Sequence, residues 1–114
     1  MIYYIDIDET IADTPVDRDY NKSKPIYENI QKANRLFDEG NHIVYWTARG
    51  TGSGIDWREV TEKQFESWGV KYHKLLFGKP IYDFLICDKA MKPDRDWETV
   101  FLLLLSNLYQ ILYL

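Results

Sequence analysis

Short apolar runs alternate with stretches of helical periodicity along the chain. An unbroken run of β-branched and aromatic residues predicts a strand buried in a parallel sheet, and apolar residues three or four positions apart predict a helix packed against it. The runs predict strands at 2–7, 42–46, within 70–77 and at 83–87, and the periodic stretches predict helices at about 26–39 and from Asp56 to Gly69. This β-α-β-α-β order predicts an α/β fold with a mostly parallel sheet and right-handed crossovers.

Two segments without periodicity follow the first two predicted strands. Residues 9–25 contain Pro15, Pro25 and several Asp, Asn and Lys residues, and the segment after Thr47 is rich in glycine. Both patterns predict loops. Since loops at the carboxyl ends of parallel strands commonly surround binding sites, we expect these two segments to border the functional site.

The C-terminal segment 97–114 would be apolar on more than one side of a helix. Apolar residues from Val100 to Leu112 share one helical face, and Leu102 and Leu103 add apolar surface elsewhere. A membrane span needs about 20 apolar residues, whereas this run is shorter and is interrupted by polar residues, so we expect no membrane association. A partner chain would cover the surplus apolar surface, and we predict a homo-oligomer built with this helix.

Composition and charge narrow the functional classes. The length of 114 residues predicts a single domain, and the 46% of hydrophobic residues indicates a folded chain. The net charge of −4 disfavours a nucleic-acid partner, because no overall basic field is present to hold phosphates. The single cysteine, Cys87, and an N-terminus without the basic and apolar regions of a secretory signal predict a cytoplasmic location.

Asp6 and Asp8 end the first predicted strand. The two-residue period of a strand points both carboxylates to one side, where the strand opens into a crevice. One carboxylate can attack phosphorus as a nucleophile, while the other protonates the leaving oxygen and later takes a proton from water. Taken alone, an Asp-x-Asp pattern is also typical of solvated acids at a strand end and of cation sites without catalysis.

Three further residues, later in the chain, supply groups that phosphoryl chemistry needs. Thr47 supplies a hydroxyl after the second strand, together with the backbone amides of its glycine-rich loop. Lys79 lies in a Gly-Lys-Pro turn, and Asp88 follows the apolar run at 83–87. These residues offer a phosphate-oxygen donor, a fixed cation and a metal carboxylate at the sheet edge that carries the acidic pair.

These motifs resemble those of the haloacid dehalogenase-like (HAD) phosphatase superfamily. The four family motifs are matched by Asp6, Asp8 and Thr10, by Thr47, by Lys79, and by Asp88 with Asp83 nearby. The segments 46–50, 68–73, 77–80 and 88–90 further resemble a small capless subgroup associated with bacterial surface-polysaccharide synthesis. The resemblance spans residues 2–92 and implies a three-layer α/β/α, Rossmann-like (HAD-like) fold without a cap domain.

The resemblance also implies a role for each matching residue. Asp6 is the expected nucleophile, which forms an aspartyl-phosphate, and Asp8 is the expected general acid and base, which also offers its backbone carbonyl to Mg²⁺. The expected ligands of Mg²⁺ are Asp6, Asp8 and Asp88, and the expected substrate-binding residues are Thr10, Thr47, Ala48, Arg49 and Lys79. The implied activity is the hydrolysis of a small phosphorylated substrate such as a sugar phosphate.

Two positions leave alternatives open. The subgroup usually carries two adjacent acids in its fourth motif, and here Cys87 stands in the first of the two places. We expect Asp88 alone to bind the metal and Cys87 to be a buried strand residue; the alternative is a lower metal affinity than in relatives. Arg49 either binds a second anionic group of the substrate or is satisfied by solvent or an aspartate.

Three other functions remain open at this stage. The first is action on a 3′-phosphate end of nucleic acid, which the acidic charge disfavours. The second is a phospho-accepting receiver domain, but there the acceptor Asp ends a later strand, where this chain has Thr47. The third is a non-catalytic module that binds Mg²⁺ or phosphate, against which the intact pair of Asp6 and Asp8 argues.

Overall fold

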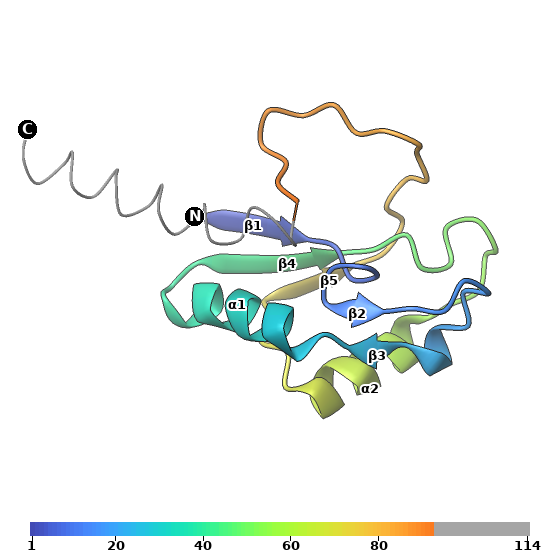
Figure 1. Ribbon diagram of the computed structural model, residues 1–114, viewed down its shortest axis with the longest axis horizontal. Coiled ribbons are helices and arrows are strands. Elements are labelled where there is room, and N and C mark those ends of the chain that lie inside the picture. Colours follow the sequence, from blue (N-terminus) through green and yellow to red (C-terminus); the bar gives the residue numbers. More distant parts are fainter. Residues whose placement is uncertain (93–114) are drawn as a thin grey trace, which may run out of the picture. The chain divides into compact units, whose positions relative to one another are not determined.

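A computed structural model describes residues 1–92 of the chain. The chain divides into two units, Met1–Asp83 and Phe84–Leu114, and the first contains every helix and strand among the described residues. Its elements are β1 (Ile2–Ile5), β2 (Ala12–Asp13), a 3₁₀ helix (Tyr20–Lys22), β3 (Lys24–Pro25), α1 (Tyr27–Asp38), β4 (His42–Trp46), α2 (Arg58–Trp68) and β5 (Lys74–Leu76), as labelled in Figure 1.

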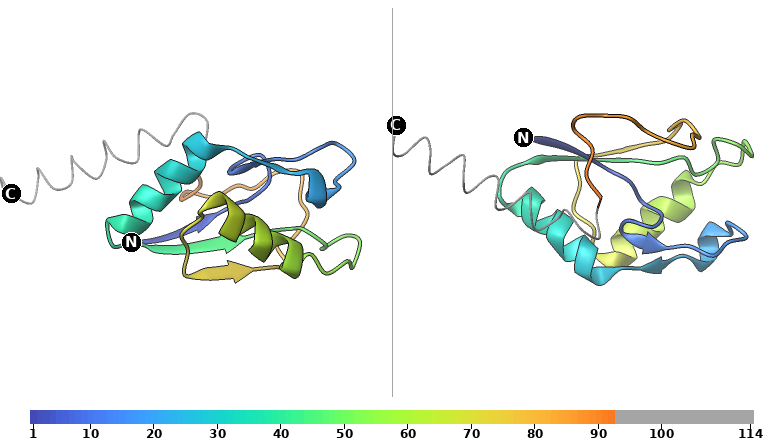
Figure 2. Two further views of the ribbon diagram at one scale, coloured as in Figure 1. Left: turned by 90° about the horizontal axis from the view of Figure 1, so that it is seen from below. Right: turned by 45° about the horizontal axis from the view of Figure 1, so that its top comes forward.

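The main sheet has three strands in the order β1-β4-β5, and both neighbouring pairs are parallel. Helix α1 connects β1 to β4, helix α2 connects β4 to β5, and both lie on the same face of the sheet (Figures 1 and 2). The predicted α/β class and parallel sheet are therefore confirmed. Residues 1–83 form two layers, a sheet and a helix layer, so the predicted third layer is not among the elements of this unit.

The core lies between the sheet and the two helices. Ile5, Tyr45 and Leu75 are paired across the three strands and are all buried. Tyr45 meets Phe65 of α2 edge to face, with ring centroids 5.0 Å apart, a geometry that aromatic pairs prefer. Helix α1 contributes the buried residues Ile30, Ala33 and Leu36. The alternate positions of the strands and the apolar stripe of each helix thus meet as the sequence periodicity predicts.

Helix α2 begins and ends close to its predicted bounds. The carboxylate of Asp56 accepts a hydrogen bond from the backbone N–H of Arg58 at 3.0 Å, which satisfies one of the free amides of the first turn. Gly69 ends the helix in the left-handed conformation, with φ of +70°, and its N–H donates to carbonyls of the last turn. Glycine adopts this conformation without the steric cost that a Cβ atom brings, which explains the stop.

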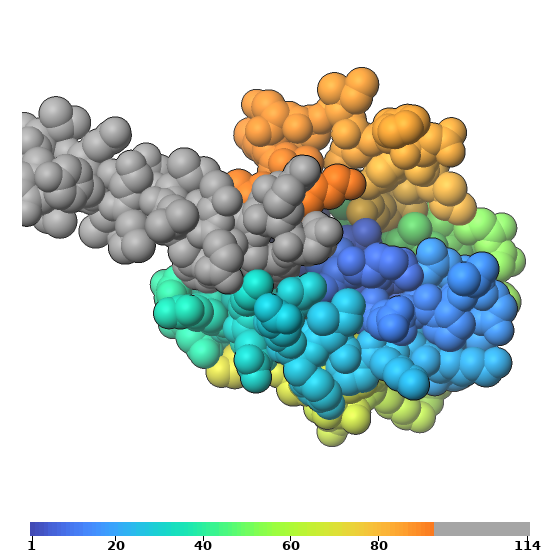
Figure 3. Space-filling view, viewed as in Figure 1, coloured from blue at the N-terminus to red at the C-terminus, as the bar shows by residue number. Residues whose placement is uncertain are grey.

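The segment 9–25 is more regular than predicted. Strands β2 and β3 pair in antiparallel fashion, so the prediction of a loop is wrong for these four residues. Two-residue strands contain too few positions to show a period, and the pattern therefore missed them. Backbone and side-chain hydrogen bonds tie the segment to the start of α1, from Ile26 N–H to Ile11 and from the Asn29 amide to Thr10. The space-filling view shows the blue segment lying directly against the cyan helix (Figure 3).

The predicted strand at 83–87 is wrong. These residues form no strand in the structure, and Phe84 and Ile86 are 89% and 97% exposed. Cys87 is exposed as well, so its expected place in a buried strand is also wrong. An apolar run indicates a preference for burial, but a strand forms only where a neighbouring strand takes its hydrogen bonds. Within residues 1–92, no strand pairs with 83–87.

Helices among residues 1–92 are too short or too polar to cross a membrane. The predicted C-terminal helix at 97–114 and the homo-oligomer that it would build lie outside the described residues.

Candidate active site

A tight turn after β1 sets the positions of Asp6 and Asp8. The carbonyl oxygen of Ile7 accepts three backbone hydrogen bonds, from the N–H groups of Thr10, Ile11 and Ala12 at 3.1, 2.8 and 3.0 Å. Ile7 itself is fully buried, and Glu9 takes a left-handed backbone conformation with φ of +62°. Because the residue between them is anchored in the core, Asp6 and Asp8 both line the cleft beside it.

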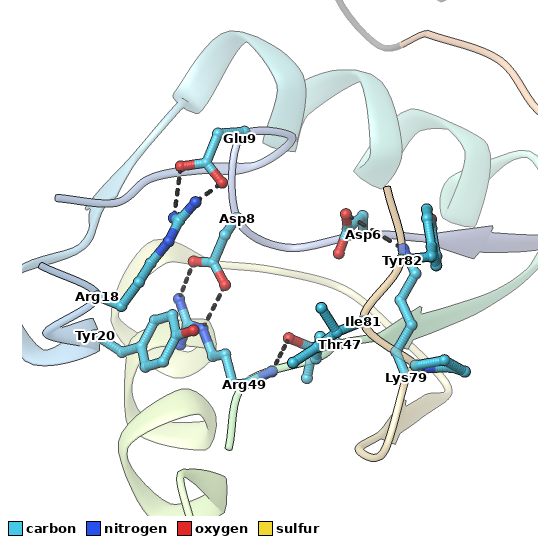
Figure 4. A pocket seen from close by; sticks show the side chains of 12 residues that line it. Asp6, Asp8, Glu9, Arg18, Tyr20, Thr47, Arg49, Lys79, Ile81 and Tyr82 are labelled. Carbon is cyan, nitrogen blue, oxygen red and sulfur yellow. Dashed lines mark hydrogen bonds and ion pairs between the residues drawn. The ribbon is translucent and has the colours of Figure 1, made fainter. Parts of the chain in front are cut away.

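The cleft has a volume of about 440 Å³ and is built from the turn after β1, the loops after β4 and β5, and the segment between β2 and β3 (Figure 4). Its lining residues are Asp6, Asp8, Glu9, Arg18, Tyr20, Thr47, Ala48, Arg49, Lys79, Pro80, Ile81 and Tyr82. All of them belong to the first unit of the chain. The carboxyl ends of the three parallel strands thus supply the site, as expected for an open α/β sheet.

Asp6 lies in the open part of the cleft and, within residues 1–92, pairs with one cation, Lys79. The Lys79 Nζ lies 3.3 Å from Asp6 Oδ2, and the Asp6 side chain is 44% exposed. The backbone N–H of Lys79 donates to the carbonyl of Thr47 at 3.0 Å, which fixes this loop beside the loop that follows β4. The ammonium also lies over the rings of Trp46 and Tyr82. Lys79 is therefore held in place as a cation directed at Asp6.

Asp8 lies in the enclosed part of the cleft and is held by a bidentate ion pair. Arg49 Nε donates to Oδ2 at 3.0 Å and Arg49 Nη2 donates to Oδ1 at 2.9 Å. The hydroxyl of Thr14, a buried residue on the segment before β3, also donates to Oδ1. The Asp8 side chain is 14% exposed and that of Arg49 is fully buried. Such a planar two-point contact fixes both position and orientation of the carboxylate.

Arg49 reaches across to α2 and to the 9–25 segment. Its Nη1 donates to Thr61 Oγ1 at 3.0 Å and to Gln64 Oε1 at 2.6 Å, both on α2. Its guanidinium carbon lies 4.7 Å from the ring centroid of Tyr20. Burial and, second, the negative charge of Asp8 raise the pKa of Tyr20 above its usual value, so this phenol stays neutral at physiological pH.

Thr47 and Ala48 present hydrogen-bond donors to the cleft. The Thr47 hydroxyl oxygen accepts from the backbone N–H of Arg49 at 3.1 Å, and no acceptor for the hydroxyl hydrogen is found within residues 1–92. The Ala48 N–H likewise has no acceptor in the described part of the chain. Two donors and the Lys79 ammonium therefore lie in the same cleft as the Asp6 carboxylate, which suits a group with several anionic oxygens.

Glu9 and Arg18 form the outer rim. Arg18 Nη1 lies 2.9 and 3.1 Å from the two Glu9 carboxylate oxygens, and both side chains are about half exposed. Arg18 also has a left-handed backbone, with φ of +58°. The hydrogen bond to Glu9 raises the pKa of Arg18 further above its usual value. The rim thus carries a permanent cation whose charge is balanced by its neighbour.

The structure brings together most of the residues that the sequence singled out. Those that line one cleft are Asp6, Asp8, Thr47, Ala48, Arg49 and Lys79. Thr10 is not among the lining residues, and its carbonyl is bound by Asn29. Asp88 belongs to the second unit, so its role as a metal ligand stays a prediction.

The glycine-rich loop borders a different hollow from the one predicted. Gly50 lines a second depression of about 240 Å³ together with Trp57 and Phe77. A Cβ atom on Gly50 would lie 2.1 Å from the carbonyl oxygen of Ile55, so glycine is required there for close packing of the loop. The residues of this segment that line the main cleft precede the glycines and are Thr47, Ala48 and Arg49.

The sequence missed the residues that surround the Asp8–Arg49 pair. They are Thr14, Tyr20, Ser23, Thr61 and Gln64. No local pattern marks them, since they come from the segment between β2 and β3 and from α2, which meet only in the folded chain. The sequence offers a signal at Thr61, a hydroxyl residue four positions from both Trp57 and Phe65, where helical periodicity favours an apolar residue.

Mg²⁺ is the metal that the sequence predicts. Of the two predicted ligands in the cleft, Asp6 has a half-exposed carboxylate, and the carboxylate of Asp8 is bound by the protein. No group of three or more His, Cys, Asp or Glu side chains is gathered for a metal within residues 1–92. The half-exposed carboxylate of Asp6 is a hard oxygen ligand of the kind Mg²⁺ prefers. Both carboxylate oxygens of Asp8 already accept hydrogen bonds from Arg49 or Thr14, so the contribution of Asp8 to a metal site would be its backbone carbonyl.

Comparison with known proteins gives one match of fold. No protein-family model matches the chain, and no curated protein matches it significantly. A crystal structure of a structural-genomics target from Vibrio cholerae is similar, with a TM-score of 0.72 and 26% sequence identity. The similarity covers 84% of this chain and 86% of the other.

Proposed function

We propose that this chain is a Mg²⁺-dependent phosphomonoester hydrolase that works through an aspartyl-phosphate on Asp6. The observation that carries the proposal is the pairing of Asp6 with Lys79 at 3.3 Å in a cleft that Thr47 and Ala48 also line. A half-exposed carboxylate beside a fixed cation and two hydrogen-bond donors is suited to attack on a phosphoryl group. The second carboxylate, Asp8, lies in the same cleft.

In the first step, an Asp6 carboxylate oxygen attacks phosphorus and the bond from phosphorus to the ester oxygen breaks. The phosphoryl oxygens are held by the Lys79 ammonium, the Thr47 hydroxyl and the Ala48 N–H. Asp8, in its acid form, gives its proton to the leaving oxygen, so that an alcohol departs rather than an alkoxide. When bound, Mg²⁺ supplies positive charge that offsets the repulsion between the anionic nucleophile and the anionic ester.

In the second step, water attacks the phosphorus of the aspartyl-phosphate. Asp8, now a carboxylate, takes a proton from this water, and the bond between phosphorus and the Asp6 oxygen breaks. Inorganic phosphate leaves, Asp6 is a carboxylate again and Asp8 is again in its acid form. One water is consumed and one alcohol and one phosphate are produced, so atoms and charges balance.

The proposal includes a three-layer α/β/α fold of HAD type without a cap. The parallel β1-β4-β5 sheet with two crossover helices supports it, as does the site at the carboxyl ends of the strands. A cleft of about 440 Å³ has room for more than a phosphate group, which supports a small phosphorylated metabolite such as a sugar phosphate.

The test is phosphate release with Mg²⁺ and with chelator over sugar phosphates, nucleotides and 3′-phosphorylated oligonucleotides. Release should require Mg²⁺, and Asp6→Asn should lower it by about 10⁴-fold or more because the nucleophile is lost. Asp13→Asn is the matched control, since Asp13 is an exposed residue of β2 outside the cleft. The best substrate decides between sugar and nucleic acid, and a folded chain that releases phosphate from none of them contradicts the proposal.

A further inference from the structure

Every N–H donor of the Arg49 side chain has an acceptor within the protein. Nε donates to Asp8 Oδ2, Nη2 to Asp8 Oδ1 and, at 3.4 Å, to Ser23 Oγ, and Nη1 to Thr61 Oγ1 and Gln64 Oε1. A guanidinium group has five N–H bonds, and these five contacts use them all. Its side chain is fully buried. Arg49 therefore has no donor left for a substrate oxygen, although it lines the cleft.

The hydrogen bonds to Asp8 differ between its two oxygens. Oδ1 accepts from Arg49 Nη2 and from the Thr14 hydroxyl, which fills both of its lone pairs. Oδ2 accepts from Arg49 Nε alone among the described residues. One lone pair thus remains on Oδ2, and it is the one place on the carboxylate where a proton can sit without displacing an existing donor.

We propose that Arg49 is a positioning residue for proton transfer: it fixes the Asp8 carboxylate so that the proton is carried on Oδ2 and delivered to the leaving oxygen. This inference rests on the proposed function. Arg49 acts through Asp8 and does not touch the substrate. The contacts of Nη1 to Thr61 and Gln64 on α2 hold the guanidinium plane, and the Tyr20 ring covers one of its faces. A lysine has the same charge but lacks the planar fork, so it cannot hold both oxygens at once.

The test compares two substrates, one whose leaving group must be protonated and one whose leaving group departs without a proton. An alkyl phosphate must leave as an alcohol, whereas 4-nitrophenyl phosphate leaves as a stable phenolate without help. Arg49→Lys should lower kcat/KM for the alkyl phosphate by about 10²-fold, since general acid catalysis contributes at least that much. For 4-nitrophenyl phosphate the loss of kcat/KM should stay below about 10-fold, because kcat/KM reports the step in which the leaving group departs.

Two more variants guard against simple misfolding. Gln64→Ala removes one Nη1 acceptor and leaves the Asp8–Arg49 pair intact, so it should show a smaller loss with the same dependence on leaving group. If circular dichroism shows that Arg49→Lys is unfolded, the kinetics of Gln64→Ala test the positioning role of Arg49. Arg58→Lys is the matched control, because Arg58 is a half-exposed residue of α2 outside the cleft, and it should keep full activity on both esters.

The outcomes separate this inference from the proposed function. An equal loss on the two esters for the arginine and glutamine variants, or a raised KM with unchanged kcat, overturns the positioning role. Asp8→Asn is measured in parallel and should show the same selectivity for alkyl esters. If Asp8→Asn shows it and the Arg49 and Gln64 variants do not, the inference fails and the function stands. If the wild-type chain releases no phosphate, both fail.

Discussion

Asp6 and Asp8 are two residues apart in the chain but have different surroundings, in the open and the enclosed half of the cleft. Asp6 is 44% exposed and has one cation at 3.3 Å. Asp8 is 14% exposed, shares two hydrogen bonds with a fully buried arginine and takes a third from Thr14. A repeated residue type thus acquires two environments because the turn at Ile7 directs one carboxylate outward and the other into a polar network. In the open half the Asp6 carboxylate is half-exposed, whereas in the enclosed half both oxygens of Asp8 accept hydrogen bonds from the protein.

The largest expected effect is a difference in stability between variants of the two aspartates. Asp8→Ala leaves two N–H donors of the buried Arg49 guanidinium without acceptors, and should lower the free energy of unfolding by about 3–5 kcal/mol. Asp6→Ala removes a partly exposed pair, and should change it by less than about 1 kcal/mol. Denaturant unfolding monitored by circular dichroism measures both. Equal losses for the two variants would show that the halves are equally important to folding.

The second expected effect is on catalysis in the open half. Lys79→Met should lower kcat/KM for the best phosphate ester by about 10²–10³-fold, because a preorganised donor to the phosphoryl oxygens is lost. Lys22→Met serves as the control, since in the described part of the chain Lys22 pairs only with Asp17 and Asp19 of its own segment. Steady-state kinetics measure the ratio. Retention of full activity by Lys79→Met would mean that the ammonium does not contact the substrate.

The smallest expected effect on stability concerns the hydroxyl group of Tyr45 in the core. The hydroxyl of Tyr45 is buried in the core with no hydrogen-bond partner among the described residues, and burial raises the pKa of this phenol well above its usual value. Tyr45→Phe should therefore leave stability unchanged or raise it by up to about 1 kcal/mol. Tyr27→Phe, at an exposed position of α1, is the control. A loss of stability in thermal unfolding would show that the Tyr45 hydroxyl is bonded after all.

The main elements were predictable because each is specified locally. The strand at 42–46 is an unbroken apolar run, and the helix that ends at Gly69 has both an apolar stripe and a glycine stop. The gathering of Asp6, Thr47 and Lys79 in one cleft followed from the rule that parallel strands end at the same edge. Local pattern and a single topological rule were enough for these features.

The features that the sequence did not reveal depend on contacts between distant segments. Asp8 meets Arg49 across 41 positions, and Thr14 joins them from a third segment. Arg49 had two interpretations from the sequence, as a ligand of the substrate or as a residue satisfied by solvent or an aspartate, and the structure shows Asp8 as its partner. The run at 83–87 illustrates the converse case, since strong local apolarity did not produce a strand without a neighbour to pair with.

The charges that line the cleft cancel, although the chain as a whole is acidic. Three acidic and three basic side chains surround it: Asp6, Asp8, Glu9, Arg18, Arg49 and Lys79. A phosphate ester approaching from a distance therefore meets little net attraction, and its association rate should depend only weakly on ionic strength. Capture of such an anion would then be governed by short-range contacts after the encounter rather than by electrostatic steering toward it.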